Sequence, residues 1–276
     1  MPELAEVETI RRDVDRLYVG LRISGADATG VRSVRRHADP ADFTRRVEGR
    51  KLVAARRRGK FLVLPMDDGQ ALVAHLGMSG QLLTAPTEAP LAKHTHVRLR
   101  FDDGPDLRFV DPRTFGQMWV SSFDGEAVPE LAHLGFDPLD DPAAARRVLE
   151  LVTGRPTRLK PLLMDQTRIV GIGNMYADEI LFAAGLRPDR PAASLSPADA
   201  KRLHRAMTSV LTAAIRYRGS SLADEQYRDL FGQIGAYQKR HKVYGRGGLP
   251  CMKCGTAVER LRSGGRSSFF CAECQS

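Results

Sequence analysis

The only cysteines of the chain form two closely spaced pairs near its C-terminus, in the order C-x2-C-x16-C-x2-C: Cys251, Cys254, Cys271 and Cys274. Two such pairs match a tetrahedral zinc site in which each pair supplies two thiolates. A disulfide or redox role is the alternative, but disulfides are disfavoured in a reducing cytoplasm. The spacing therefore predicts one zinc ion, and closure of the site by four thiolates predicts a structural rather than a catalytic ion.

The N-terminal segment Met1-Pro2-Glu3 offers a second chemistry. A small second residue normally permits removal of Met1, which leaves Pro2 with a free secondary amine. A far larger fraction of such an amine than of a lysine is unprotonated at neutral pH. Its attack on a sugar C1′ gives an iminium, the electron sink for β-elimination of a phosphate, and Glu3 is placed to transfer protons. The alternative is that Glu3, Glu6 and Glu8 are first-turn acids that complement a helix dipole.

The elements that must position these groups begin with a helix. Apolar residues recur at spacings of three or four over residues 4–19, at Val7, Ile10, Val14 and Leu17, which predicts an amphipathic helix. Short β-forming runs follow, separated by turns such as Asp67-Asp68-Gly69, at residues 61–64, 71–75, 97–101 and 107–110. The predicted fold class is α+β, with an N-terminal β-sandwich that starts with a helix.

Helical spacing dominates residues 143–218. The clearest helix opens at Ser196, with Pro197 in its first position and Asp199 three residues after the cap, and it stops at Gly219. The sequence thus predicts a helical second domain.

The last part of the chain is polar and then rich in cysteine. The aromatic, polar run 220–248 shows no regular period, and Gly264-Gly265 fits the tip of a β-hairpin between the cysteine pairs. We expect three domains, at residues 1–135, 136–245 and 246–276.

Composition favours a polyanionic partner. The 276 residues include 42 Lys and Arg against 33 Asp and Glu, a formal net charge of +9. No apolar run approaches the roughly 20 residues that span a bilayer, and the N-terminus lacks the pattern of a signal peptide. A cytoplasmic protein that binds nucleic acid, with no membrane partner, is therefore expected.

Several motifs occur in one order along the chain: Arg57-Arg58-Gly59-Lys60-Phe61, His75-Leu76-Gly77-Met78-Ser79-Gly80, Asp111-Pro112-Arg113-Thr114-Phe115-Gly116, Lys160-Pro161-Leu162-Leu163-Met164-Asp165, Gly171-Ile172-Gly173-Asn174-Met175-Tyr176-Ala177-Asp178-Glu179, Val243-Tyr244-Gly245-Arg246 and Gly265-Arg266-Ser267-Ser268-Phe269-Phe270-Cys271. With the N-terminal segment, this set resembles the formamidopyrimidine-DNA glycosylase family, which includes endonuclease VIII. The resemblance spans nearly the whole chain. One departure is Ala5, where the family motif carries a second proline.

The resemblance implies a β-sandwich, a helix-two-turn-helix domain and a zinc finger, with DNA bound between the two halves. It implies a bifunctional glycosylase and abasic-site lyase of base-excision repair in bacteria, associated with the nucleoid. The expected substrate is double-stranded DNA that contains 8-oxoguanine, formamidopyrimidines or abasic sites. A monomer is expected because each copy holds a whole site.

The resemblance also assigns roles to residues. Pro2 is the expected nucleophile and Glu3 the general acid/base, with Lys60 and Arg266 as further catalytic residues that hold the DNA backbone. Glu6 is a lesion-pocket candidate, and the segment 220–237 is expected to close over the extruded base. The expected DNA contacts are His75, Met78, Arg113, Phe115, Lys160 and Asn174.

Several of these residues have plainer interpretations. Met78, Arg113 and Phe115 would fill the gap left by a flipped nucleotide, but an isolated Met or Phe is more often a core residue. Asn174 could cap a helix, and His75 could be a satisfied core histidine. Lys60 could be one more cation of a solvated basic run.

Other functions remain open on the sequence. An endonuclease VIII-like enzyme would remove oxidised pyrimidines, and a lesion-binding protein on this scaffold would lack catalysis. A zinc-ribbon transcription or ribosomal factor would explain the charge and the cysteines, but not the N-terminal motif.

Overall fold

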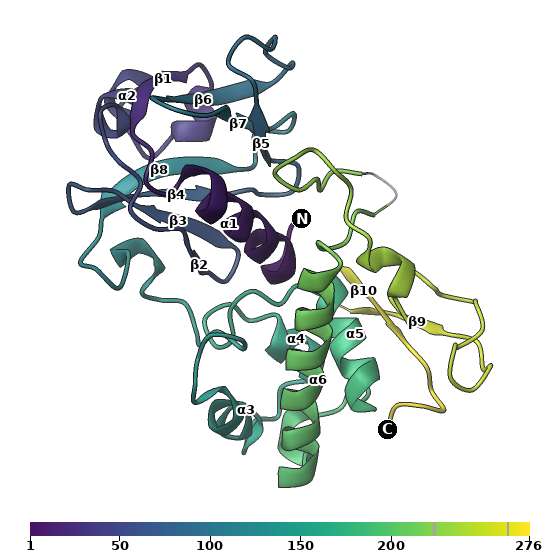
Figure 1. Cartoon of the computed structure of the whole chain (residues 1–276). Helices are drawn as coiled ribbons and strands as arrows, with labels where there is room; N and C mark the ends of the chain where they lie inside the picture. Colours follow the sequence, from purple (N-terminus) through teal and green to yellow (C-terminus); the bar gives the residue numbers. More distant parts are fainter. Residues whose placement is uncertain (223–224, 264) are drawn as a thin grey trace. The chain divides into compact units, whose positions relative to one another are not determined.

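The structure is a computed structural model that describes residues 1–222, 225–263 and 265–276. The chain divides into two compact units (Figure 1). The first contains Met1–Ala132 and Tyr217–Ala236, and the second contains His133–Arg216 and Tyr237–Ser276. Of the two glycines expected at a hairpin tip, Gly264 lies outside the described residues.

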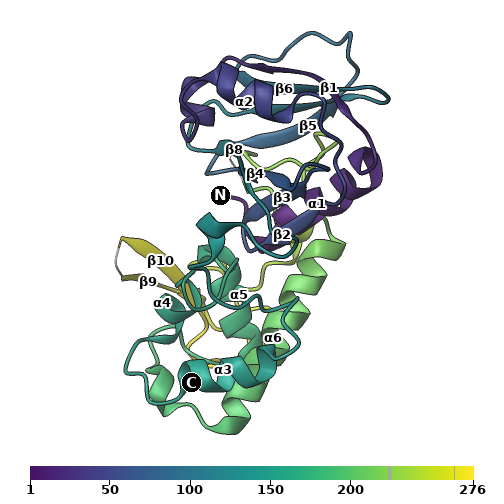
Figure 2. The same ribbon diagram turned by 90° about the vertical axis from the view of Figure 1, so that its left-hand side faces the viewer.

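The first unit is built on two four-stranded antiparallel sheets, stacked as Figure 2 shows. One sheet has the order β1-β6-β7-β5, with bounds Ile23–Ala28, Thr95–Phe101, Asp106–Val110 and Gln81–Ala85. The other has the order β2-β3-β4-β8, with bounds Arg56–Arg58, Phe61–Pro65, Gln70–His75 and Gln117–Ser122. The core contains side chains of both sheets, among them Leu64, Leu72, Leu99 and Phe109. The predicted β-sandwich is confirmed.

Helix α1 (Leu4–Tyr18) packs against this core. Its apolar stripe is buried as the spacing predicted, since Val7, Ile10 and Val14 are at most 2% exposed. A smaller helix, α2 (Pro40–Val47), is capped by Asp39, whose side chain accepts the Asp42 amide. Short 3₁₀ turns complete the unit at Val31–Val34 and Pro129–Leu131.

The segment Tyr217–Ala236 belongs to the first unit, although it lies within the range 136–245 that we expected to form the helical domain. Tyr227 and Leu230 are buried in the core of the sandwich. The Thr84 amide also donates to the Leu230 carbonyl at 2.8 Å. Burial of these apolar side chains, which no local pattern announces, fixes the segment there.

The second unit contains four helices and a hairpin within its described residues. The helices are α3 (Ala144–Val152), α4 (Leu159–Leu163), α5 (Asn174–Ala184) and α6 (Pro197–Arg216), and the hairpin pairs β9 (Glu259–Ser263) with β10 (Arg266–Phe270). Short 3₁₀ turns lie at Ala192–Ser194 and Tyr237–Arg240. No helix in the described part of the chain is long and apolar enough to cross a membrane.

Local signals set both ends of α6. The Ser196 hydroxyl accepts the Asp199 amide, and the Asp199 carboxylate accepts the Ser196 amide, each at 3.1 Å. This reciprocal cap satisfies two helix-end groups. The helix ends before Arg218 and Gly219, which have φ of 59° and 77°. The predicted cap and stop are both confirmed.

Candidate functional site

The start of α1 holds the predicted nucleophile and acid in a buried position. Pro2 is buried, and Glu3 is 4% exposed. Glu3 is the helix N-cap, and its amide donates to Glu6 Oε2 at 2.9 Å in a capping box. The structural alternative, acids at the start of a helix, therefore holds for this pair, with Glu3 at the N-cap and Glu6 in the first turn. It does not conflict with a proton-transfer role, because the cap holds the Glu3 backbone in one place.

Glu6 connects the start of α1 to the segment Tyr217–Ala236. Its side chain is buried, and Oε1 accepts the Ser220 amide at 2.8 Å. A Cβ added at Gly219 would lie 2.7 Å from the same oxygen. The backbone therefore passes too close to Glu6 for a larger residue at position 219.

Lys60 and His75 lie at the ends of neighbouring strands of the second sheet, Lys60 directly before β3 and His75 as the last residue of β4. Lys60 is 7% exposed, in the tight turn that joins β2 to β3. His75 ends β4, with its ring 4.7 Å from that of Phe61. Burial and the charge of Lys60 lower the pKa of His75 to about 4. The imidazole is therefore neutral at pH 7, and any contact that it makes to a phosphate is a neutral hydrogen bond.

Met78, Arg113 and Phe115 form an exposed cluster. Met78 is 43% exposed and Phe115 is 46% exposed, so neither is a core residue. The Arg113 guanidinium lies 4.8 Å from the Phe115 ring centroid, and Nη2 lies 3.9 Å from the Met78 sulfur. Large apolar side chains grouped at a surface mark a contact site. Two separate loops bring these residues together.

A buried carboxylate, for which the sequence predicted no role, organises these loops. Asp111 is fully buried, and its Oδ1 accepts the Ser79 hydroxyl at 2.6 Å and the Arg113 amide at 3.2 Å. Its Oδ2 accepts the Gly116 amide at 2.7 Å. Asp111 therefore ties the two loops together.

Gly77 allows the same two loops to approach each other. It has φ of 60°, and a Cβ there would lie 2.6 Å from backbone atoms of Phe115 and Gly116. The sequence did carry a signal for this contact between the two loops. An acid begins the Asp-Pro-Arg turn, and a glycine lies in the motif 75–80 that packs against it.

His94 also joins this region and was missed. It has φ of 66°, and its carbonyl accepts the Asp111 amide at 3.0 Å. A non-glycine residue in the left-handed region is strained, and such residues cluster at functional sites. The exposed His94 side chain therefore adds a candidate ligand-contacting group beside the cluster.

In the second unit, Asn174 is the first residue of α5, and Gly173 takes the cap position. Asn174 Oδ1 is buried and has no hydrogen-bond partner among the described residues. The helix start presents backbone amides, which favour an anion. Because Gly173 and not Asn174 takes the cap position, the cap interpretation of Asn174 is wrong.

Lys160 points into the protein rather than out to solvent. It is 3% exposed, and Nζ lies 2.7 Å from Asp178 Oδ1 and 2.7 Å from the Ser267 carbonyl. Asp178 Oδ2 accepts the Phe269 amide at 3.0 Å. The pair therefore attaches strand β10 to α4 and α5, so the structure gives Lys160 a bracing contact.

Arg266 begins β10 and is exposed. It lines a cavity of about 330 Å³ together with Arg158, Lys160 and Ser268. The exposed guanidinium is thus presented by a strand that the buried Lys160 and Asp178 hold in place.

The four cysteines fit a single zinc ion. Their sulfur atoms all lie within 4.8 Å of one another. The Cys254 and Cys271 sulfurs are 3.4 Å apart, and those of Cys251 and Cys274 are 4.0 Å apart. Tetrahedral ligands about 2.3 Å from zinc lie roughly 3.8 Å apart. The predicted four-thiolate site is confirmed, and its four sulfur atoms fit one structural zinc ion.

Known protein families match nearly the whole chain. Three family models match: the formamidopyrimidine-DNA glycosylase N-terminal domain over residues 1–118, its H2TH domain over 134–226, and the zinc finger found in FPG and IleRS over 248–276. Formamidopyrimidine-DNA glycosylase of Acidothermus cellulolyticus is 45% identical and that of Salinispora arenicola is 44% identical. The alignments cover 100% of this chain and 97% and 96% of those proteins.

Solved structures of the same family are similar to this chain over its whole length. The MutM (Fpg) protein of Thermus thermophilus is 41% identical, with a TM-score of 0.86 over 99% of this chain and 98% of that one. A Lactococcus lactis Fpg variant in complex with Fapy-dG-containing DNA is 30% identical, with a TM-score of 0.90 over the full length of both chains. The chain belongs to the formamidopyrimidine-DNA glycosylase family of base-excision-repair enzymes.

Proposed function

We propose that this chain removes oxidised purines, such as 8-oxoguanine and formamidopyrimidines, from double-stranded DNA and then cleaves the strand at the resulting abasic site. The observation that carries the proposal is the buried pair Pro2 and Glu3, held by the capping box with Glu6 at the start of α1. The pair supplies an amine and an adjacent carboxyl group in a fixed relation. These are the two groups that the reaction needs.

The proposed reaction begins with Pro2. Once Met1 is removed, the Pro2 nitrogen attacks C1′ of the damaged nucleotide, and the base leaves with the electron pair of the broken bond and takes up the proton that the Pro2 nitrogen loses. Glu3 protonates the sugar ring oxygen as the ring opens, which leaves an iminium between Pro2 and C1′. The iminium accepts the electron pair released when a proton leaves C2′, and the 3′ phosphate is expelled by β-elimination. A second elimination expels the 5′ phosphate, and water releases the sugar fragment from Pro2.

The cations have supporting roles in this proposal. Lys60 and Arg266 are proposed to hold the phosphates that leave and to stabilise their charge. The structure supports Arg266 in this role through its exposure at the start of β10. Lys160 is proposed to act on DNA through Arg266, since its amine contacts Asp178 and the Ser267 carbonyl.

A base inside a duplex must be extruded before its C1′ can be attacked. The exposed cluster of Met78, Arg113 and Phe115 is proposed to fill the vacated space, with Arg113 facing the unpaired partner base. Side chains that wedge between base steps are apolar and exposed before binding. The exposure of Met78 and Phe115 supports this role.

DNA is the proposed partner. Relatives from Lactococcus lactis were solved with DNA that contains Fapy-dG, an abasic site or an oxidised pyrimidine. The net charge of +9 favours phosphate contacts in general. Asn174 and His75 are the proposed neutral contacts, and the exposed His94 is a further proposed contact.

A borohydride trapping experiment tests the proposal. The protein is incubated with an 8-oxoguanine:cytosine duplex and sodium borohydride, and with a matched duplex that contains an oxidised pyrimidine. We expect strand cleavage and a covalent adduct with the purine lesion. A variant with one residue added before Pro2, which blocks the amine, should give neither. Specific binding without an adduct would overturn the enzymatic proposal, and faster cleavage of the pyrimidine duplex would overturn the substrate assignment.

A further inference from the structure

The hairpin β9–β10 presents one of its faces to a cavity in the second unit. Its register pairs Ser268 with Leu261, and residues two apart on a strand point to the same side. Arg266, Ser268 and Leu261 therefore share one face, and all three line the cavity of about 330 Å³. Small-molecule sites range over about 300–1,000 Å³. The cavity is therefore large enough for one small molecule.

Helix α4 and the loop that follows α5 form the other walls of this cavity. Arg158 is the cap residue of α4, Pro161 lies within the helix, and Met164 follows it. Pro188 lines the cavity from the loop. The loop is joined to the helix, because the Lys160 amide donates to the Pro188 carbonyl at 3.1 Å. The walls are therefore connected to one another by the fold of the second unit.

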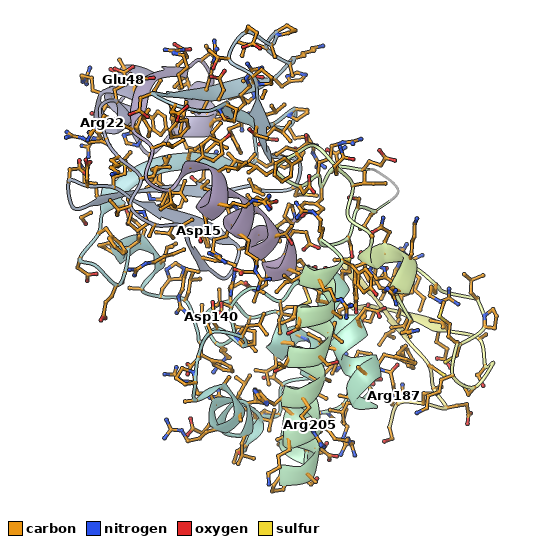
Figure 3. The ribbon with its side chains drawn as sticks, viewed as in Figure 1. Asp15, Arg22, Glu48, Asp140, Arg187 and Arg205 are labelled. Atoms are coloured by element: carbon orange, nitrogen blue, oxygen red, sulfur yellow. The ribbon has the colours of Figure 1, made fainter. Side chains whose placement is uncertain are left out.

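The two acids that line the cavity already have counter-ions. Asp165 Oδ2 lies 3.0 Å from Arg168 Nε. Asp189 accepts two hydrogen bonds from Arg187, at 3.0 and 3.1 Å, and Arg187 is labelled in Figure 3. The bonds from Arg187 hold the pKa of the Asp189 carboxyl below its ordinary value. Neither acid is therefore left to neutralise another cation of the cavity.

Two guanidinium groups at the cavity have no counter-ion. Lys160 is paired with Asp178. By contrast, the side chains of Arg158 and Arg266 make no ion pair or hydrogen bond with any residue that the structure describes. Arg158 acts on Asp189 only at longer range. Both arginines are exposed, so a ligand in the cavity can reach them.

A buried hydroxyl lines the same cavity. Ser268 is 6% exposed, and its side chain has no hydrogen-bond partner in the described part of the chain. Buried polar side chains nearly always have a partner, so each exception needs an explanation. A ligand that accepts a hydrogen bond from the hydroxyl would supply the missing partner.

The chemistry of the lining indicates the class of ligand. The remaining side chains are apolar: Pro161, Met164, Pro188 and Leu261. A thioether makes favourable contacts with aromatic rings, and guanidinium groups stack on them. A phosphate monoester carries about −1.5 to −2 charge at pH 7, which matches two arginines without counter-ions. A phosphate diester within a DNA strand carries a single charge.

We propose that this cavity binds a phosphate monoester with a flat aromatic body, the chemical class of a nucleoside monophosphate. Arg158 and Arg266 hold the phosphate, the Ser268 hydroxyl donates to one of its oxygens, and the base lies on the apolar lining. The site is separate from the proposed reaction, but it shares Arg266 with it. A bound nucleotide therefore competes with DNA for that guanidinium.

Calorimetric titration of the zinc-loaded full chain with dAMP tests the site directly. We expect saturable binding. Deoxyadenosine lacks the phosphate and ribose 5-phosphate lacks the base, so each should bind at least about tenfold more weakly than dAMP. Absence of saturable binding, or equal affinity for the three compounds, would overturn the proposal.

Matched variants assign the binding to the cavity. Arg158→Ala should lower the affinity for dAMP about tenfold or more, because hydrogen bonds between charged groups are the strongest class. Ser268→Ala should lower it about threefold, since it removes one hydroxyl. Arg205→Ala removes an exposed cation from α6, labelled in Figure 3, and should leave the affinity unchanged. Unchanged affinity in Arg158→Ala, or an equal loss in Arg205→Ala, would overturn the site.

A phosphate monoester also occurs at the end of a DNA strand. A short single strand with a 5′ phosphate is therefore titrated beside the same strand without it. A gain in affinity from the terminal phosphate that is lost in Arg158→Ala identifies a strand end as the ligand. Binding of dAMP without such a gain identifies a free nucleotide.

Competition with DNA gives a second measurement, which rests on the proposed function. Rising dAMP should inhibit cleavage of an 8-oxoguanine duplex, and Arg158→Ala should need about tenfold more dAMP for the same fractional inhibition. Equal inhibition of both proteins would place the nucleotide at the DNA site and overturn the cavity assignment. If the unchanged protein cleaves no duplex, the proposed function is wrong, whereas the titration still decides whether the cavity binds a nucleotide.

Discussion

Replacement of Asp111 by asparagine should loosen the two loops that carry the exposed cluster of Met78, Arg113 and Phe115. The fully buried carboxylate accepts three hydrogen bonds, from the Ser79 hydroxyl and from the Arg113 and Gly116 amides. An asparagine amide group offers one oxygen in place of two. Whichever way it turns, its NH2 faces a donor, either the Gly116 amide or the Ser79 and Arg113 pair.

The magnitude follows from these contacts. A hydrogen bond to a charged group contributes about 1.5–3 kcal/mol, and a buried donor left without a partner costs about 1–3 kcal/mol. Since the asparagine can retain the contacts on one side, Asp111→Asn should lower the free energy of unfolding by roughly 2–4 kcal/mol. A domain of ordinary stability, about 5–15 kcal/mol, remains folded after such a loss.

The functional assay compares a damaged base in duplex with the same base in a single strand. Only the duplex requires residues that fill the vacated space. Asp111→Asn should therefore lower excision from the duplex much more than from the single strand. Urea unfolding measures stability in parallel, and Asp103→Asn, an exposed acid in a turn, is the matched control. Unchanged stability, or an equal loss on both substrates, would refute the role assigned to Asp111.

Four further predictions follow from other contacts. Cys254→Ser should reduce zinc content, measured by metal analysis, and strand cleavage together, and a zinc-loaded variant with unchanged activity would contradict a four-thiolate site. His75→Gln should make the free energy of unfolding less sensitive to acid. In the folded protein the pKa of His75 is about 4, whereas in the unfolded chain it is 6.5. The stability that the neutral histidine contributes is therefore full above pH 6.5 and is lost as the pH falls toward 4. Urea midpoints from pH 7 to 4 would check this, with parallel curves as the contrary result. Lys160→Met should lower stability by about 3 kcal/mol by leaving a buried acid unpaired. That loss of stability should be greater at pH 8 than at pH 6. Burial raises the pKa of Asp178 to about 7, and the protonated acid needs no cation beside it. A loss in thermal unfolding that does not depend on pH would contradict this prediction. Gly77→Ala should destabilise the protein and impair duplex excision, since φ is +60° and the new Cβ would meet backbone at 2.6 Å, whereas an unchanged melting temperature would show that the loops can separate.

Sequence alone determined the features that depend on nearby residues. The cysteine spacing predicted the zinc ligands, because two residues between each pair set the geometry of the site. The apolar period predicted α1. Ser196, Pro197 and Gly219 predicted the ends of α6, because caps and left-handed turns are made by residues within a few positions.

Tertiary structure decided which side chains face solvent. From sequence, Met78 and Phe115 fit a core as well as a surface, and only the packing of two loops over Asp111 leaves them exposed. The sequence motif predicted that Lys160 contacts DNA, yet the fold places the buried acid Asp178 2.7 Å from its amine. A motif specifies residue types but not the partners that a distant part of the chain brings to them.

The placement of the segment Tyr217–Ala236 was likewise decided by the fold. No periodic pattern marks it, and it follows the helices directly in sequence. Its position depends on two sets of contacts. Tyr227 and Leu230 pack into the core of the sandwich, and Arg218 binds Asp13, which lies 205 residues earlier. Such long-range contacts form only when the whole unit folds, because their stabilisation must exceed the entropy lost in closing a long loop.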